Sequence, residues 1–140
     1  MRNLGFSFFV LLVVAGMTLA CGTSSTPPER LLQSVTVSPA AADAHDFPGG
    51  KVQFTATGYF SAPPSPESPL GTFWQACYQG ASTSGVSIDQ NGGVAQCAAG
   101  AVGTYTVFTE NYSNAHGGCE ATSACGGGCF VTGTAQLTCP

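Results

Sequence analysis

The side chains best suited to chemistry in this 140-residue sequence are its seven cysteines. One lies near the N-terminus and six lie in the second half, and an even number is what a complete set of disulfides requires. A metal cluster is the alternative for the last four, but zinc sites usually contain a close Cys-x2-Cys pair, which this sequence lacks. We therefore predict disulfides, and with them an oxidising, exported setting, for Cys77, Cys97, Cys119, Cys125, Cys129 and Cys139.

Groups for acid–base or nucleophilic catalysis are few. The sequence has two histidines, His45 and His116, and neither a Gly-x-Ser-x-Gly nor a His-Glu-x-x-His motif. Asp43 and Asp46 flank His45 and could contact a divalent cation, although three polar residues in a short loop are more typical of a solvated turn. We predict no catalytic residue, metal site or cofactor, and keep a small exported hydrolase that uses His45 or His116 as the third alternative for function.

The seventh cysteine, Cys21, ends an apolar N-terminal segment that begins with the positively charged Arg2. Leu19 and Ala20 precede it, so the site resembles the lipobox of bacterial lipoproteins, although Thr18 stands where that motif usually has Leu. The resemblance implies cleavage before Cys21 and its modification with lipid, including an amide-linked acyl chain such as palmitate. A secretory signal that leaves Cys21 as a thiol is the alternative. A transmembrane helix is disfavoured, because no positive stop-transfer flank follows the apolar segment.

This interpretation divides the chain into a signal peptide (1–20), a lipid-anchored flexible tether (21–33) and a domain (34–140). Gly22, rather than Asp, follows the cysteine, and the same resemblance then implies the outer membrane if the cell is Gram-negative. After cleavage two basic residues remain, Arg30 and Lys51, against seven acids, which is too little positive charge for nucleic acid. The predicted partner is therefore a membrane, contacted through the lipid on Cys21, and not nucleic acid.

The rest of the sequence predicts β-structure. Seven segments alternate apolar and polar residues with a period of two between Gly, Pro or Asn, namely 34–38, 51–60, 72–78, 86–88, 94–97, 104–110 and 130–139. The second contains Gly58, which we expect to shift the phase as a β-bulge does. The predicted fold is an all-β antiparallel sandwich of about seven strands, with these side chains inside: Val35, Val37, Val52, Phe54, Ala56, Trp74, Ala76, Tyr105, Val107, Val131, Ala135 and Leu137.

Several motifs between residues 34 and 110 support a more specific comparison. Their order resembles that of bacterial immunoglobulin-like domains of group 2 type, which include the repeats of intimin-type and invasin-type surface proteins. The motifs are SVTVSPA from Ser34, VQFTATG from Val52, Trp74, GVSI from Gly85, NGGVA from Asn91 and GAVGTYTV from Gly100. The resemblance implies an immunoglobulin-like sandwich but no particular ligand, because such domains serve as spacers, adhesin modules or accessory domains.

Two segments depart from that pattern. Residues 61–69 are rich in proline and are expected to form an extended connector between strands. Residues 111–129 form an insertion rich in Gly and Cys before the last strand, which we expect to need disulfides to hold its shape.

The topology of an alternating sandwich limits the disulfide pairs. The strands that end at Cys77, Cys97 and Cys139 would run toward one end, and a disulfide cannot span the length of a strand. We therefore expect Cys77 to pair with Cys97, with one cysteine of the insertion reaching Cys139 and two closing a local loop. The insertion would then fold back along the sheet.

Aromatic residues offer a candidate binding surface. Phe73, Phe108 and Phe130 lie opposite in phase to core positions, and either Tyr59 or Phe60 must point outward. An exposed apolar patch made of Phe60, Phe73, Phe108 and Phe130 would mark a contact site. The favoured alternative is that the insertion covers these rings as a small second core.

The functional prediction combines these observations. We expect a lipid-anchored domain of the cell envelope with a structural or binding role and no catalysis. The alternative is an adhesin-like module that binds a glycan or an envelope protein.

Overall fold

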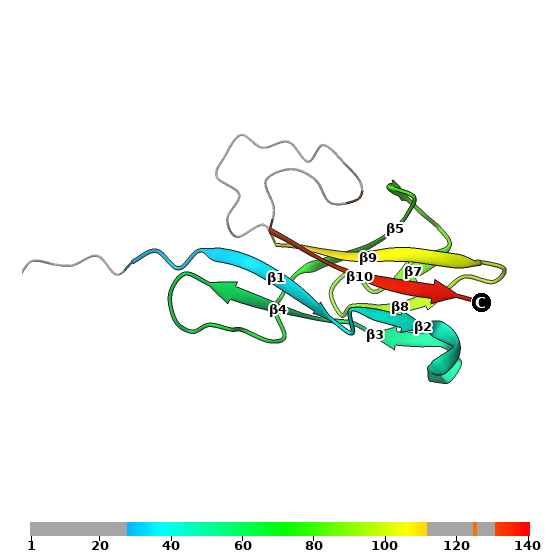
Figure 1. Ribbon diagram of the computed structural model, residues 1–140, viewed down its shortest axis with the longest axis horizontal. Helices are drawn as coiled ribbons and strands as arrows, with labels where there is room; N and C mark the ends of the chain where they lie inside the picture. Colours follow the sequence, from blue (N-terminus) through cyan, green and yellow to red (C-terminus); the bar gives the residue numbers. More distant parts are fainter. Residues whose placement is uncertain (1–27, 112–124, 126–130) are drawn as a thin grey trace, which may run out of the picture.

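The computed structural model describes residues 28–111, 125 and 131–140 (Figure 1). The predicted signal peptide, Cys21 and most of the tether lie outside these residues, as do His116, Cys119, Cys129 and Phe130. No helix in the described part of the chain is long and apolar enough to cross a membrane. The elements in that part are β1 (Leu32–Ser38), β2 (Ala41–Asp43), η1 (Ala44–Asp46), η2 (Pro48–Gly50), β3 (Lys51–Gln53), β4 (Thr55–Phe60), β5 (Phe73–Tyr78), β6 (Ala81–Ser82), β7 (Val86–Ile88), β8 (Val94–Cys97), β9 (Gly103–Asn111) and β10 (Val131–Cys139).

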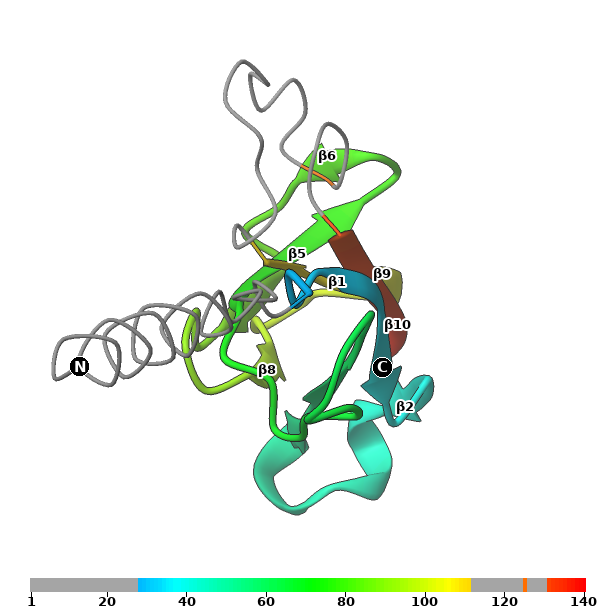
Figure 2. The same cartoon turned by 90° about the vertical axis from the view of Figure 1, so that its left-hand side faces the viewer.

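The strands form three sheets around one core (Figure 2). A five-stranded sheet has the order β2-β10-β9-β5-β6, a three-stranded sheet the order β3-β8-β7, and β1 pairs with β4. The predicted all-β sandwich is confirmed. The prediction of a purely antiparallel sandwich is wrong at one pair, because the short edge strand β2 runs parallel to β10.

The inward side chains come from all three sheets, as alternation along each strand requires. Of the twelve side chains expected inside, eleven are buried and Val131 is half-buried against the core. Gly133 of β10 shows why a strand interior holds a glycine here. A Cβ at this position would lie 2.8 Å from Cγ1 of Val35, so the missing side chain lets β1 lie close over β10.

The segment 51–60, expected to be one strand, is divided between two sheets. β3 pairs with β8, whereas β4 pairs with β1, and Phe54 between them donates its N–H to the carbonyl of Gly93 at 3.0 Å. Gly58 does not shift the phase, which corrects the predicted bulge. Its pairing with Val35 is regular, and the irregularity lies in β1 between Leu32 and Ser34.

Candidate functional site

One disulfide joins the two larger sheets inside the core. Cys97 of β8 is bonded to Cys139 of β10, with their Cα atoms 5.8 Å apart. Cys139 is 3% exposed and belongs to the core cluster. The second disulfide joins Cys77 of β5 to Cys125, with a Cα–Cα distance of 5.9 Å. Cysteines are kept reduced in the cytosol, so two disulfides indicate an oxidising, exported environment.

The predicted pair of Cys77 with Cys97 is therefore wrong. Trp74 and Ala76 point into the core, so Cys77, which follows Ala76, points to the outer face of β5 and cannot meet a core cysteine. A cysteine of the insertion does bond to a cysteine of the sheet, as expected, but its partner is Cys77 and not Cys139. The other two cysteines of the insertion, Cys119 and Cys129, lie outside the described residues, and with them the predicted local loop.

The outer face of the five-stranded sheet carries a second buried region. Phe108 of β9 is 1% exposed although its neighbour Val107 points into the core, and both Phe108 and Cys77 lie outside the core cluster. On this face Gln75 pairs with Phe108 and Cys77 with Thr106. We call this region, made of the buried Cys77, Phe108 and Glu110 and the half-buried Thr106, the outer cluster.

The outer cluster corrects the predicted aromatic surface. Phe108 is buried and cannot contact a ligand. Phe60 and Phe73 are half-buried and lie in different sheets, so they form no common patch, and Phe130 lies outside the described residues. The burial of Phe108 agrees with the expectation of a second core; the covering by residues 112–124 falls on a segment that is not described.

Glu110 is the one acid among the buried polar residues of the described chain, at 4% exposure. It lies on the outer face, opposite Phe73 on one side and Thr132 on the other. Burial removes water from the carboxylate and raises the pKa of Glu110 above the ordinary value of 4.5. The protonated form of this side chain is therefore favoured by the fold.

At the end where the described chain begins, Arg30 fastens that segment to the proline-rich connector. Its guanidinium carbon lies 3.4 Å from the centre of the Phe60 ring. Nη2 donates to the carbonyl of Pro64 at 2.6 Å and to Oε2 of Glu67 at 2.8 Å. Arg30, expected to lie within the flexible tether, is thus part of the domain surface.

Ser61 extends this contact to the neighbouring backbone. Its Oγ accepts a hydrogen bond from the N–H of Leu31 at 2.9 Å and donates one to the carbonyl of Glu29 at 3.1 Å. Its own N–H donates to the carbonyl of Leu31 at 2.8 Å. We call the set Glu29–Leu31, Phe60, Ser61, Pro64 and Glu67 the Arg30 clamp. It fixes the direction in which the chain enters β1.

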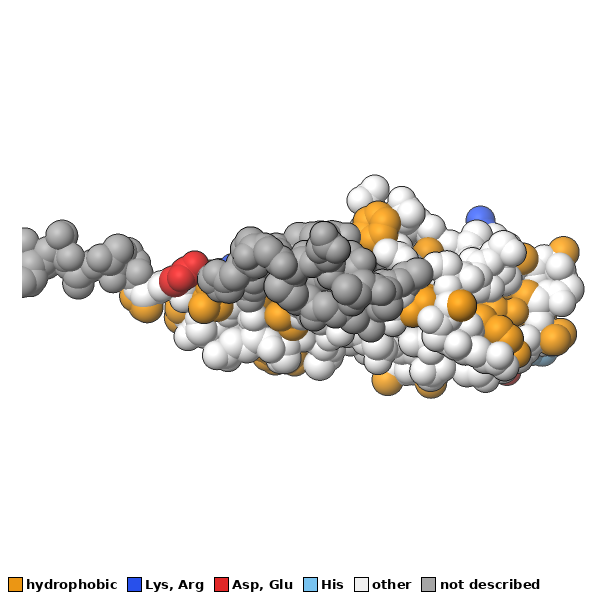
Figure 3. Space-filling view, turned by 90° about the horizontal axis from the view of Figure 1, so that it is seen from above, with side chains coloured by type: hydrophobic (Ala, Val, Ile, Leu, Met, Phe, Trp, Pro, Cys, Tyr) orange, Lys and Arg blue, Asp and Glu red, His pale blue; other side chains and the backbone are white. Residues whose placement is uncertain are grey.

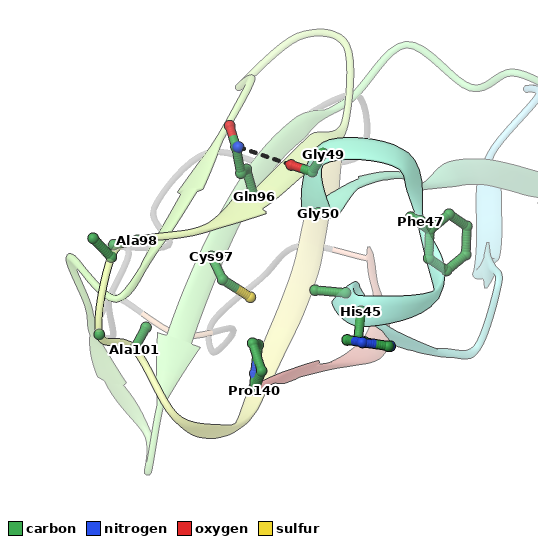
Figure 4. Close-up of a pocket in the computed structure, with 12 residues that line it drawn as sticks. His45, Phe47, Gly49, Gly50, Gln96, Cys97, Ala98, Ala101 and Pro140 are labelled. Atoms are coloured by element: carbon green, nitrogen blue, oxygen red, sulfur yellow. Dashed lines mark hydrogen bonds between the residues drawn. The ribbon is translucent and has the colours of Figure 1, made fainter.

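A cleft of about 500 Å³ opens at the opposite end, where β8 and β10 finish (Figure 4). Nε2 of Gln96 donates to the carbonyl of Gly49 at 3.0 Å, which holds η2 against β8. Apolar side chains gather on the same end of the surface in Figure 3, and Val102 is 64% exposed. Apart from His45 and Gln96 the cleft is lined by small or apolar residues: Ala44, Phe47, Gly49, Gly50, Cys97, Ala98, Ala99, Gly100, Ala101 and Pro140.

The loop that was considered for a cation forms a turn. Oδ1 of Asp43 accepts the N–H of His45 at 2.9 Å and so caps η1. Nδ1 of His45 is 3.9 Å from Oδ1 of Asp46, and both side chains are more than three-quarters exposed. Within the described ranges no three His, Cys, Asp or Glu side chains are grouped for a metal ion. This geometry is that of a solvated turn at the rim of the cleft.

Neither the Arg30 clamp nor the cleft was predicted from the sequence. Arg30 and Glu67 are 37 residues apart, and only the folded connector brings them together. Comparison with other proteins adds no family: no protein-family model matches the chain, and a search of the curated proteins finds no match.

Proposed function

We propose that this protein is a lipid-anchored, immunoglobulin-like domain of the bacterial cell envelope, with a structural or binding role and no catalysis. The observation that carries the proposal is the pair of disulfides, because they need the oxidising compartment to which a lipoprotein signal directs a chain. The sequence supplies that signal at Leu19-Ala20-Cys21. The several acyl chains of a lipid-modified Cys21 would hold the protein at the membrane more firmly than a single acyl chain would.

The Arg30 clamp gives this proposal an orientation. The chain enters the domain at the end that the clamp fixes, and η1, η2 and the C-terminus, which line the cleft, lie at the other end (Figure 1). A domain anchored at Cys21 would therefore direct the cleft with Phe47 and Pro140 away from the membrane. A binding role is favoured over a spacer role because this far end presents a concave, largely apolar surface.

Fractionation of cells that express the full chain tests the anchor. The protein labelled with an alkyne analogue of palmitate is expected in the membrane fraction, and Cys21→Ser is expected to lose both the label and the membrane location. Cys125→Ser is the matched control, since it removes a cysteine without touching the predicted lipid site and should keep the label. Unchanged labelling of Cys21→Ser would overturn the proposal.

A further inference from the structure

A second opening lies between the edges of two sheets. β5 of the five-stranded sheet and β7 of the three-stranded sheet both line an open groove of about 300 Å³. It is separate from the cleft that contains Phe47 and Pro140, because the two share no lining residue. The groove is lined by Phe73, Trp74, Gln75, Ala76, Ser82, Thr83, Val86, Ile88 and Gln90.

The walls of the groove are uncharged but rich in hydrogen-bonding groups. None of the nine lining residues has a charged side chain, and five have side chains that can form hydrogen bonds: Trp74, Gln75, Ser82, Thr83 and Gln90. A carboxamide or hydroxyl both donates and accepts, which suits a ligand whose own groups do both. A charged ligand would lose water here without gaining an opposite charge, so the groove disfavours it.

Hydrogen bonds on both walls fix the shape of the groove before a ligand binds. The N–H of Trp74 donates to the carbonyl of Gln90 at 2.9 Å and fixes the β7–β8 turn against β5. Oδ1 of Asp89 accepts the N–H of Asn91 at 3.0 Å within that turn, and Oγ1 of Thr83 accepts the N–H of Gly85 at 2.9 Å on the other side. A site that is already formed loses less entropy on binding.

The edge of β5 is poorly suited to an added peptide strand. Its backbone is used at Trp74 by Gln90 and at Cys77 and Tyr78 by pairing with β6. Strand addition needs a row of unpaired backbone groups, so recognition along β5 must come from side chains. Along β5, a ligand made of hydroxyl groups is therefore favoured over a polypeptide.

We infer that the groove between β5 and β7 binds an uncharged glycan chain. Gln75 and Gln90 hydrogen-bond to sugar hydroxyls, while Phe73 and Ile88, both half-buried, contact an apolar face of a sugar ring. Because the groove is open to solvent, a chain can extend beyond it at either side. The inference goes beyond the proposed function and does not depend on the lipid anchor.

The test uses the mature protein extracted in detergent, with immobilised neutral hexasaccharides of the malto, cello, xylo and manno series and with charged polygalacturonate. We expect binding to at least one neutral series, and no preference for the charged polymer. The double variant Gln75→Ala with Gln90→Ala is expected to bind at least about tenfold more weakly, since it removes two sets of hydrogen bonds. Gln136→Ala is the matched control, because this exposed glutamine lies on β10 away from the groove and should bind as the wild type does.

Three results would overturn the inference. They are binding to none of the neutral series, stronger binding to polygalacturonate than to any neutral series, and equal binding by the double variant. Selection of extended peptides that compete at the groove would instead assign it to a polypeptide and also overturn it. None of these results bears on the lipid at Cys21, so the two proposals fail independently.

Discussion

The two faces of the five-stranded sheet are both buried at its centre, but in different ways. On the inner face Tyr105 and Val107 join the main core, and the disulfide of Cys97 with Cys139 ties this sheet to the one opposite. On the outer face Phe108 is equally buried outside that core, beside a disulfide to Cys125. Both faces of β9 are therefore packed against other parts of the protein, whereas in a two-layer sandwich one face of each strand is left to solvent.

The largest expected effect is the loss of the Phe108 ring. Phe108→Ala should lower the free energy of unfolding by about 3–5 kcal/mol, as for a phenylalanine inside an ordinary core. Denaturant unfolding measures this loss, and Phe60→Ala, which changes a half-buried ring, is the control with a smaller expected loss. A loss below about 1 kcal/mol for Phe108→Ala would mean that the outer cluster is not a core.

The two disulfides come next and allow a direct comparison of the faces. They close loops of similar length, with sequence separations of 42 and 48 residues, so loop closure favours nearly equal contributions of about 2–4 kcal/mol. The pairs of variants are Cys97→Ala with Cys139→Ala and Cys77→Ala with Cys125→Ala. Thermal unfolding of each pair is expected to show a similar fall. A negligible fall for the outer pair alone would show that the bond to Cys125 constrains nothing.

The Arg30 clamp shows how much a partly exposed contact contributes to the free energy of unfolding. Arg30→Ala should cost about 1 kcal/mol, because the ion pair with Glu67 and the contact with Phe60 remain partly in water. Lys51→Ala removes the other positive charge of the described chain, is exposed, and should change the unfolding free energy less. An equal effect of the two variants would show that the clamp contributes only general charge.

The smallest effect is the pH dependence of Glu110. A carboxyl whose folded pKa is raised stabilises the fold in its protonated form, so its contribution is present below the ordinary pKa of 4.5 and is lost as pH rises through the folded pKa. Glu110→Gln cannot ionise and should therefore melt higher than the wild type at pH 7. The two melting temperatures should converge below pH 4.5. A variant that melts lower at pH 7 would mean that a positive group pairs with this carboxylate.

Alternation along the strands predicted the core and could have predicted one disulfide. Ala135 and Leu137 were expected inside, and the same phase places Cys139 inside with them. The neighbouring positions of Ala76 and Cys77 point to opposite faces, which excludes Cys77 from any pair in the core. The sequence prediction used the ends of the strands and ignored their faces, and for that reason it chose the wrong partner for Cys97.

Other features depend on folded loops and cannot be found by alternation. β2 and β6 are three and two residues long, too short for a period to show. The change of sheet at Phe54 leaves the alternation of Val52, Phe54 and Ala56 intact, so the pattern predicts one strand where there are two. The groove between β5 and β7 depends on how two different sheets lie next to each other, and alternation along a single strand does not reveal this.

The most direct test of the account is peptide mapping, by mass spectrometry without reduction, of the protein extracted from membranes and digested by pepsin at acid pH, where thiol exchange is slow. The account predicts an acylated peptide that begins at Cys21 and cross-linked peptides that join Cys77 to Cys125 and Cys97 to Cys139. An unmodified N-terminal peptide, free thiols at these four cysteines, or a link between Cys77 and Cys97 would contradict it.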